Sequence, residues 1–139
     1  MPALRVVDAG LALRLALPGP EQARVQALVD GWRQTGDTLM APDLWLYEVT
    51  SALTKAVHFG ALTDSEGRRL LGLLHRLDVK LISPDVTSAT LAYEWARRLG
   101  RAAAYDSFYL ALAEASRAEL WTADQRLVAA VALPWVRSI

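Results

Sequence analysis

Short strand-like runs alternate with longer helical stretches along this chain, and this alternation limits the folds open to it more than any other feature. The helical stretches carry apolar residues at spacings of three and four, whereas the strand-like runs are short and bounded by turn-forming residues. The alternation predicts an α/β architecture with a mainly parallel central sheet. The expected strands are Leu4–Val7, 38–41, 79–82, Glu119–Thr122 and an edge strand at 134–137, where proline is tolerated.

The expected helices fill the intervals between these strands. Thr63 is followed three residues later by Glu66, which is the pattern of a capping box at a helix start. At 139 residues, the chain is expected to form a single domain, 1–139. The expected helices are a stretch after Asp8 that ends before Pro18, residues 21–33, residues 43–59, a helix capped by Thr63, a helix capped by Asp85 or Thr87 that ends near Gly100, a helix from about Asp106, and residues 124–131.

Composition limits the kinds of functional site that this chain can carry. The chain has no cysteine, and His58 and His75 lack the partner spacing of a zinc site or a nucleophilic triad. Its 15 basic and 15 acidic residues balance, so RNA binding would need a local basic patch. Arg97, Arg98 and Arg101 form the densest patch, although a solvated helix end explains them equally simply.

The chain shows neither a signal-peptide pattern nor an apolar run long enough to span a membrane. A cytoplasmic location is therefore the expectation from the sequence.

Three aspartates stand where a strand-like run gives way to a helix. Asp8 directly follows the first strand, Asp124 lies two residues beyond the fourth, and Asp106 opens a helix. Ligands of open parallel sheets gather at the carboxyl ends of the strands, so these carboxylates are expected to share one rim. Each of them taken alone is also explained as a helix N-cap, a position that favours aspartate.

Glu48 lies on a helix face that also carries apolar side chains, among them Leu44 and Ala52. A glutamate directed toward a core needs a cation, a hydrogen-bond partner or a raised pKa. The sequence leaves two explanations open, a functional cation site and an internal ion pair with Arg5 or Arg14.

Taken together, Asp8, Glu48, Asp106 and Asp124 predict a metal site. Four carboxylates on one rim repel each other unless a cation neutralises them, and Mg²⁺ or Mn²⁺ prefers oxygen ligands. Such an ion binds substrate phosphate oxygens and activates water, which indicates hydrolysis of a phosphodiester. Thr122 and Ser107 are candidates to donate hydrogen bonds at this site, although a strand threonine and a first-turn serine are ordinary structural residues.

Four motifs of the chain resemble those of PIN-domain ribonucleases, and the spacing between them also fits. Within that family, the chain looks most like the VapC toxins of toxin–antitoxin pairs, and the resemblance covers almost the whole sequence. The motifs are Val6-Val7-Asp8-Ala9, Pro42-Asp43-Leu44-Trp45 leading to Glu48 with Ser51-Ala52-Leu53 behind it, Ala104-Tyr105-Asp106-Ser107-Phe108-Tyr109-Leu110-Ala111-Leu112-Ala113 and Leu120-Trp121-Thr122-Ala123-Asp124-Gln125-Arg126-Leu127.

The resemblance implies a PIN-like three-layer α/β/α sandwich and an endoribonuclease that depends on Mg²⁺ or Mn²⁺. It implies that Asp8, Glu48, Asp106 and Asp124 are the catalytic metal ligands and that Thr122 is the accompanying hydroxyl. The fourth acid is the least uniform position in such proteins. The chain departs from the family at Ala9-Gly10, where a small polar residue is common, so a hydroxyl contact in the first motif is not expected.

The resemblance also implies partners. Relatives commonly form homodimers and bind a small antitoxin across helices that correspond to residues 43–59 and 63–77. Trp45, Phe59 and the leucines of the second helix are candidates for this contact, and ordinary core packing explains them equally well.

Three other classes of protein fit the sequence less well than a nuclease. A non-catalytic PIN-like module that binds RNA or protein would not need four mutually repelling acids. Phosphoacceptor and dehalogenase-type domains need a well-placed lysine or a second aspartate at position 10, and this chain has only Lys55 and Lys80 as lysines and Gly10 at that position.

Overall fold

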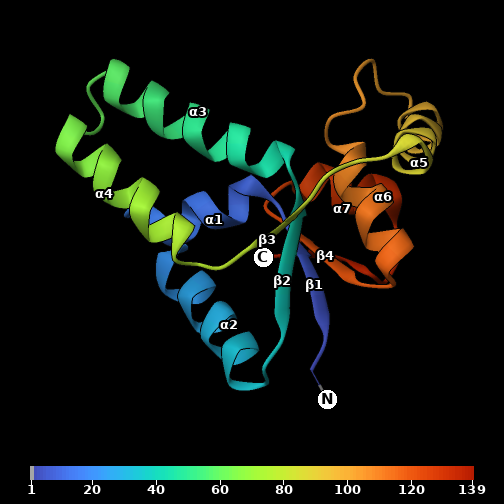
Figure 1. Ribbon diagram of the computed structural model, residues 1–139, viewed down its shortest axis with the longest axis horizontal. Helices are drawn as coiled ribbons and strands as arrows, with labels where there is room; N and C mark the ends of the chain where they lie inside the picture. The colour runs from blue at the N-terminus through green and yellow to red at the C-terminus, as the bar shows by residue number, and fades with distance from the viewer. Residues whose placement is uncertain (1) are drawn as a thin grey trace.

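The chain folds around a parallel β-sheet in a computed structural model that describes residues 2–139 (Figure 1). Within these residues the strand order is β3-β2-β1-β4-β5, and every neighbouring pair is parallel. The predicted alternation, including the edge strand, is confirmed, although β5 begins two residues later than expected. The strands are β1 (Leu4–Val7), β2 (Thr38–Pro42), β3 (Lys80–Ile82), β4 (Glu119–Thr122) and β5 (Val136–Ser138).

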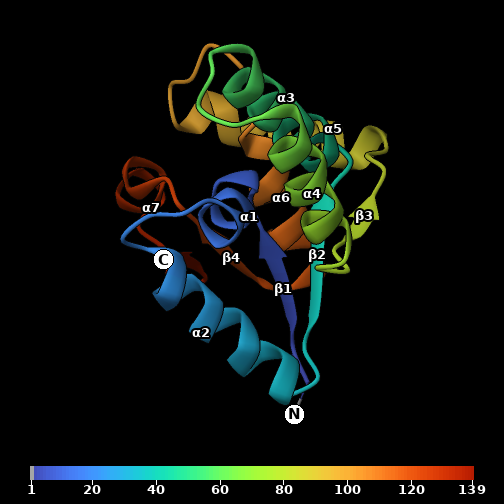
Figure 2. The same ribbon diagram turned by 90° about the vertical axis from the view of Figure 1, so that its left-hand side faces the viewer.

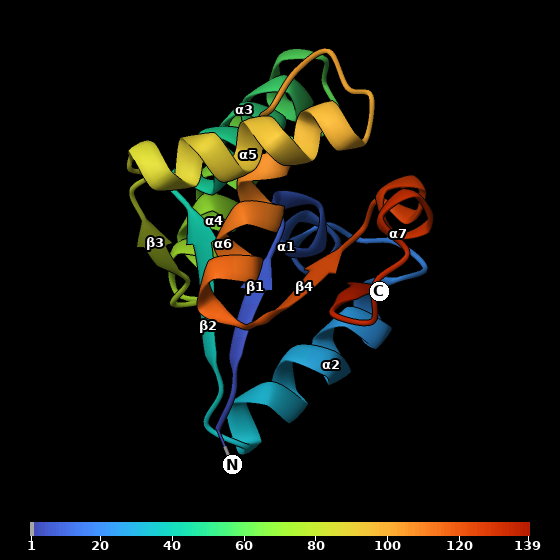
Figure 3. The ribbon, with the colours of Figure 1, turned by 90° about the vertical axis from the view of Figure 1, so that its right-hand side faces the viewer.

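Helices cover both faces of the sheet and complete a three-layer α/β/α sandwich. Figure 2 looks onto the face covered by α1, α2 and α4, and Figure 3 onto the opposite face, where α5 packs on α6 and α6 on the central strands. The helix α3 runs from the end of β2 and packs against α1 and α4. The helices are α1 (Ala9–Ala16), α2 (Gln22–Gln34), α3 (Leu44–His58), α4 (Asp64–His75), α5 (Val86–Arg98), α6 (Ser107–Ser116) and α7 (Gln125–Val131).

The core lies where the central strands meet the inner faces of α1 and α6. Strands of a parallel sheet are buried on both faces, so apolar runs such as Val6-Val7 in β1 and 39–41 in β2 are required there. The helix α6 contributes Leu110 and Ala113, which are fully buried. The predicted strand positions therefore follow from the need to bury these runs.

Local sequence signals set the helix ends. Thr63 and Glu66 form the predicted capping box at the start of α4. Asp85, rather than Thr87, caps α5 by accepting a hydrogen bond from Ser88 N at 2.8 Å. Of the helices in residues 2–139, none has the length and apolar character needed to cross a bilayer.

The topology creates one reversal point in the sheet. The chain builds outward from β1 through β2 to β3 and then returns to place β4 on the other side of β1. The carboxyl ends of β1 and β4 are therefore neighbours at a topological switch point, where ligands of open α/β sheets bind.

Candidate active site

The five residues predicted from the sequence surround one pocket at the switch point. Asp8 follows β1, Thr122 ends β4, and Asp124 precedes α7, while Glu48 extends from α3 and Asp106 precedes α6. In Figure 3, α3 lies above the strands and α6 crosses in front of them. We call this cavity the acidic pocket, and it is lined by Asp8, Ala9, Gly10, Glu48, Asp106, Tyr109, Leu120, Thr122, Asp124 and Leu127.

Asp8 is held by three hydrogen bonds. One carboxylate oxygen accepts from Leu11 N at 2.8 Å, and the other accepts from Thr122 Oγ1 at 2.6 Å and from Ala123 N at 3.1 Å. Burial raises the pKa of Asp8, although these hydrogen bonds and the charge of Arg14 oppose the shift. Asp8 therefore caps α1, as the simple explanation predicted, and lines the pocket at the same time.

Thr122 links the first and fourth acids. Its buried hydroxyl donates to Asp8 and accepts from the backbone N–H of Asp124 at 2.9 Å. Asp124 in turn caps α7 by accepting from Arg126 N at 3.0 Å and Leu127 N at 3.1 Å. This threonine fixes the orientation of Asp8 relative to the loop that carries Asp124.

The carboxylate of Glu48 accepts a hydrogen bond from a tyrosine. The hydroxyl of Tyr109 on α6 donates to Glu48 Oε1 at 2.6 Å, across 61 residues of sequence. Burial raises the pKa of Glu48, the hydrogen bond from Tyr109 lowers it, and the charges of Asp106 and Asp8 raise it further. The net shift is upward, as expected for a carboxylate that faces other carboxylates.

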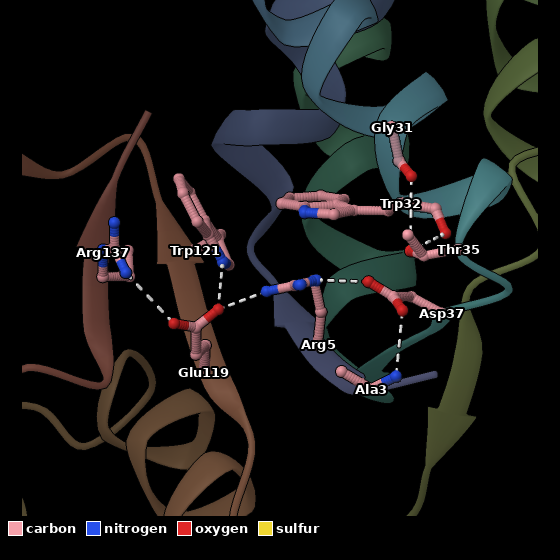
Figure 4. A network of polar contacts seen from close by, with 9 residues as sticks. All are labelled: Ala3, Arg5, Gly31, Trp32, Thr35, Asp37, Glu119, Trp121 and Arg137. Atoms are coloured by element: carbon pink, nitrogen blue, oxygen red, sulfur yellow. Dashed lines mark hydrogen bonds and ion pairs between the residues drawn. The ribbon is translucent and has the colours of Figure 1, made fainter. Parts of the chain in front are cut away.

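The expectation that Arg5 or Arg14 pairs with Glu48 is wrong. Arg5 pairs with Asp37 and Glu119 near the amino ends of the strands, as Figure 4 shows, and Arg14 pairs with Glu21 at 3.0 Å. Because both arginines are paired with other acids, neither of them neutralises the carboxylate of Glu48.

Tyr109 is the residue of this site that sequence reasoning missed. It is almost completely buried, and burial together with the hydrogen bond to Glu48 raises its pKa well above the ordinary tyrosine value. A usable signal was present, because Tyr109 lies three residues after Asp106 and therefore on the same face of the helix.

Asp106 behaves differently from the other two aspartates. It stands at the N-cap position of α6, yet among residues 2–139 its side chain accepts no capping hydrogen bond. The side chain is 52% exposed and lies 3.5 Å from the guanidinium of Arg101. The capping explanation therefore fails for Asp106, and its carboxylate is available to a ligand.

Two further expectations from the sequence concern Ser107 and the departure from the family motif at Gly10. Ser107 is buried, has no hydrogen-bond partner for its hydroxyl within the described residues, and lies outside the pocket lining, so the suggested contact with a ligand is not supported. At Gly10 a Cβ would lie 2.9 Å from the Ala123 side chain. The departure from the family at this position thus has a steric reason, because α1 packs tightly on the loop after β4.

The chemistry of this pocket fits a hard divalent cation. In residues 2–139, one ion pair, that of Asp106 with Arg101, offsets the four carboxylates. No group of three or more acids or histidines in those residues is already gathered closely enough to hold a metal. Mg²⁺ does not require such a group, because it keeps several waters and uses one or two carboxylates together with substrate phosphates.

Solved structures with the same fold include toxins. A protein from Pyrobaculum aerophilum, PAE2754, has a TM-score of 0.69 at 23% identity, with 92% of this chain and 79% of that chain covered. VapC20 of Mycobacterium tuberculosis, described as a sarcin-ricin loop cleaving toxin, has a TM-score of 0.69 at 14% identity, covering 96% and 98%. A toxin–antitoxin complex from Klebsiella pneumoniae has a TM-score of 0.70 at 16% identity, covering 97% and 95%.

No curated protein matches this sequence. The model of the PIN domain family matches residues 5–133, which include every acid of the pocket. With this match over nearly the whole chain and the shared fold of the solved structures, the protein belongs to the PIN domain family.

Proposed function

We propose that this protein is an endoribonuclease that depends on Mg²⁺ or Mn²⁺ and acts as the toxin of a toxin–antitoxin pair in the cytoplasm. The observation that supports this best is the convergence of four carboxylates from four separate segments on one pocket. Burial of charge without a cation is costly, and a core built only for stability would not gather these acids. PIN family membership and the toxins among the structural neighbours support the same activity.

In this proposal Asp8, Glu48, Asp106 and Asp124 form the metal site, where one or two of them would contact the ion directly and the others would contact the waters that it keeps. When bound, the ion supplies Lewis-acid stabilisation of the scissile phosphate and a more acidic water. The protein's own residues orient the acids. Thr122 holds Asp8 through its hydroxyl, and Tyr109 holds Glu48 in one position by donating at 2.6 Å.

The experiment that tests the proposal is cleavage of a cellular RNA pool by the purified chain with Mg²⁺, Mn²⁺ or chelator. We expect discrete fragments that require metal and that disappear in Asp106→Asn, since the substitution removes a ligand charge at an exposed side chain with little change in size. Asp30→Asn, an exposed acid on α2, is the matched control and retains wild-type cleavage.

Two results would contradict this function. Cleavage that persists in Asp106→Asn would show that the acidic pocket is not the site. Absence of cleavage by wild-type protein, freed of any co-purified inhibitor and supplied with total RNA, would favour the non-catalytic module.

We also propose a protein partner, a cognate antitoxin, together with a homodimer. Structural neighbours include VapBC2 from Rickettsia felis and FitAB, each described as bound to a DNA fragment. The predicted contact helices leave apolar side chains exposed at Phe59, Leu71 and Leu73. Trp45 is buried, so the core explanation holds for its side chain, which forms the floor of a groove between α3 and α4.

A test of the partner is co-expression with the product of the neighbouring gene. Formation of a stable complex that suppresses metal-dependent cleavage would support the antitoxin. A neighbouring product that neither binds nor inhibits would contradict it.

A further inference from the structure

A second groove opens directly beside the acidic pocket. We call it the flanking groove, and two of its residues, Glu48 and Asp106, also line the acidic pocket. A chain of nucleotides that places a phosphate in the pocket can continue into this adjoining groove. The flanking groove is lined by Leu44, Glu48, Arg101, Ala102, Ala103, Tyr105 and Asp106.

Arg101 is anchored at the wall of this groove by the end of α5. Gly100 adopts φ +66°, Gly100 N donates to Arg97 O at 3.1 Å, and Arg101 N donates to Ala96 O at 2.9 Å. These two bonds form a Schellman motif, which needs the left-handed glycine. The backbone of Arg101 is thus held rigidly, and its side chain, 30% exposed, reaches Asp106.

The structure separates the three arginines that the sequence grouped as one basic patch. Arg98 lies over the ring of Trp95, 4.3 Å from its centroid, and Arg97 is exposed to solvent. Arg101 is the member of the trio that lines the flanking groove and contacts an acid of the pocket. A phosphate in the groove therefore meets Arg101 rather than the patch as a whole.

Tyr105 supplies an aromatic surface at the same place. Tyr105 is 67% exposed and lines the groove together with Arg101. The small side chains of Ala102 and Ala103 complete the lining. An exposed aromatic ring beside a cation is the arrangement on which proteins stack unpaired bases and bind the adjoining phosphate.

We propose that the flanking groove binds the nucleotide next to the scissile phosphate of a single-stranded RNA, with Arg101 on its phosphate and Tyr105 stacked on its base. This inference rests on the proposed function and names the substrate class for it. Arg101 pairs with Asp106 in the free protein and exchanges that carboxylate for the phosphate in the complex. Arg101 and Tyr105 would both contact the substrate directly, and neither is among the acids that would hold the metal.

Binding of a labelled single-stranded RNA dodecamer of mixed sequence, and of the duplex formed with its complement, tests this assignment. Fluorescence anisotropy is measured in Ca²⁺, an ion that takes oxygen ligands, and a gel verifies that the RNA stays intact. We expect Arg101→Ala and Tyr105→Ala each to weaken single-strand binding about tenfold, within the range for loss of one stacked base or one charge-assisted contact. Tyr105→Phe, which keeps the ring, retains wild-type affinity.

The chain offers matched controls for both substitutions. Arg97→Ala removes the same charge at the end of the same helix, and Tyr93→Ala removes a tyrosine that is 64% exposed on α5. Neither control changes affinity. The dependence of log affinity on log salt becomes shallower by about 0.7 in Arg101→Ala, the value for one phosphate contact on a single strand.

The outcomes distinguish this inference from the proposed nuclease activity. If the protein cleaves RNA with metal but Arg101→Ala and Arg97→Ala change RNA affinity equally, the proposed role of the flanking groove is wrong and the proposed nuclease activity stands. Duplex binding as tight as single-strand binding would overturn base stacking. Single-strand binding that depends on Arg101 and Tyr105, without cleavage in Mg²⁺ or Mn²⁺, would support RNA binding in the flanking groove and contradict the proposed nuclease activity.

Discussion

At the scale of single residues, the contact between Tyr109 and Glu48 explains how a half-buried glutamate stays available for a cation. The hydroxyl donates to one carboxylate oxygen, Oε1, and Glu48 also lines the acidic pocket. It also opposes the upward shift of the Glu48 pKa that burial and the neighbouring aspartates cause. The tyrosine therefore helps to keep Glu48 ionised near neutral pH.

Replacing Tyr109 with Phe should move the acidic limb of the pH–rate profile to higher pH. Without the hydroxyl, the pKa of Glu48 rises further, so a smaller fraction of the carboxylate is ionised at each mildly acidic pH. The measurement is the rate of RNA cleavage between pH 5 and pH 9 at a fixed, saturating metal concentration. Profiles that superimpose after normalisation would show that Glu48 does not titrate in the rate-limiting step.

At the scale of elements, a polar network joins four strands near their amino ends, away from the acidic pocket (Figure 4). Arg5 in β1 donates from Nε to Asp37 at 2.7 Å and also pairs with Glu119 in β4, which Arg137 of β5 contacts at 3.2 Å. The Asp37 side chain, just before β2, is 1% exposed and also accepts from Ala3 N at 2.9 Å. The network thereby aligns β2, β1, β4 and β5 and sets the position of their carboxyl ends.

Asp37→Asn should lower the free energy of unfolding by about 2 kcal/mol at neutral pH, the order expected for a lost hydrogen bond to a charged partner. Burial raises the pKa of Asp37, but the bonds from Ala3, Arg5 and Thr35 and the charge of Arg5 outweigh burial and hold it below 3.8. A lowered pKa gives stability that is present above 3.8 and is lost as pH falls through the lowered value.

Urea unfolding at pH 7 and pH 3 measures both effects. The difference in unfolding free energy between wild type and Asp37→Asn shrinks at pH 3, because pH 3 lies below 3.8 and the stability due to the lowered pKa of Asp37 is being lost there. Asp64→Asn, which removes an exposed ion pair with Arg68, is the control and leaves stability almost unchanged. A control effect as large as that of Asp37→Asn would mean that burial of the network does not matter.

At the scale of the whole molecule, charge is balanced in number but not in space. Fifteen basic and fifteen acidic residues give no net charge, yet four acids share one pocket at the switch point. The raised pKa values of Asp8 and Glu48 mean that the folded chain holds these protons more tightly than the unfolded chain does. In the metal-free protein these two carboxylates therefore destabilise the fold above their raised pKa values, and their contribution becomes more favourable as pH falls through those values.

Glu48→Gln should raise the melting temperature of the metal-free protein at pH 7. The amide keeps an oxygen for the Tyr109 hydroxyl and removes one of the repelling charges. Mg²⁺ should stabilise wild type by about 2.7 kcal/mol at a hundred times its Kd, and the variant by less, because the variant has lost a ligand charge. Differential scanning fluorimetry with chelator and with a Mg²⁺ series tests both expectations.

Glu94→Gln, an exposed glutamate on α5, is the control for the loss of one acidic charge. It should alter neither the metal-free melting temperature nor the effect of Mg²⁺. A melting temperature of Glu48→Gln below that of wild type, with the same response to Mg²⁺, would show that Glu48 is a structural residue.

Signals that act over a few residues were sufficient to predict most of the fold. The run Val6-Val7, the capping box of Thr63 and Glu66, and the glycine after α5 each depend on local backbone chemistry. The order of the aspartates relative to strand ends was predictable for a similar reason, because parallel strands present their carboxyl ends at one edge.

Local sequence was enough to predict which carboxylates follow strands and that Thr63 caps a helix, because both depend on neighbouring residues. Tertiary structure alone decided which side chains meet across the fold. Glu48 received Tyr109 rather than Arg5 or Arg14, and Arg101, not Arg97, came to lie beside Asp106. Such choices depend on packing between elements far apart in sequence, where a shift of one helical turn exchanges one partner for another.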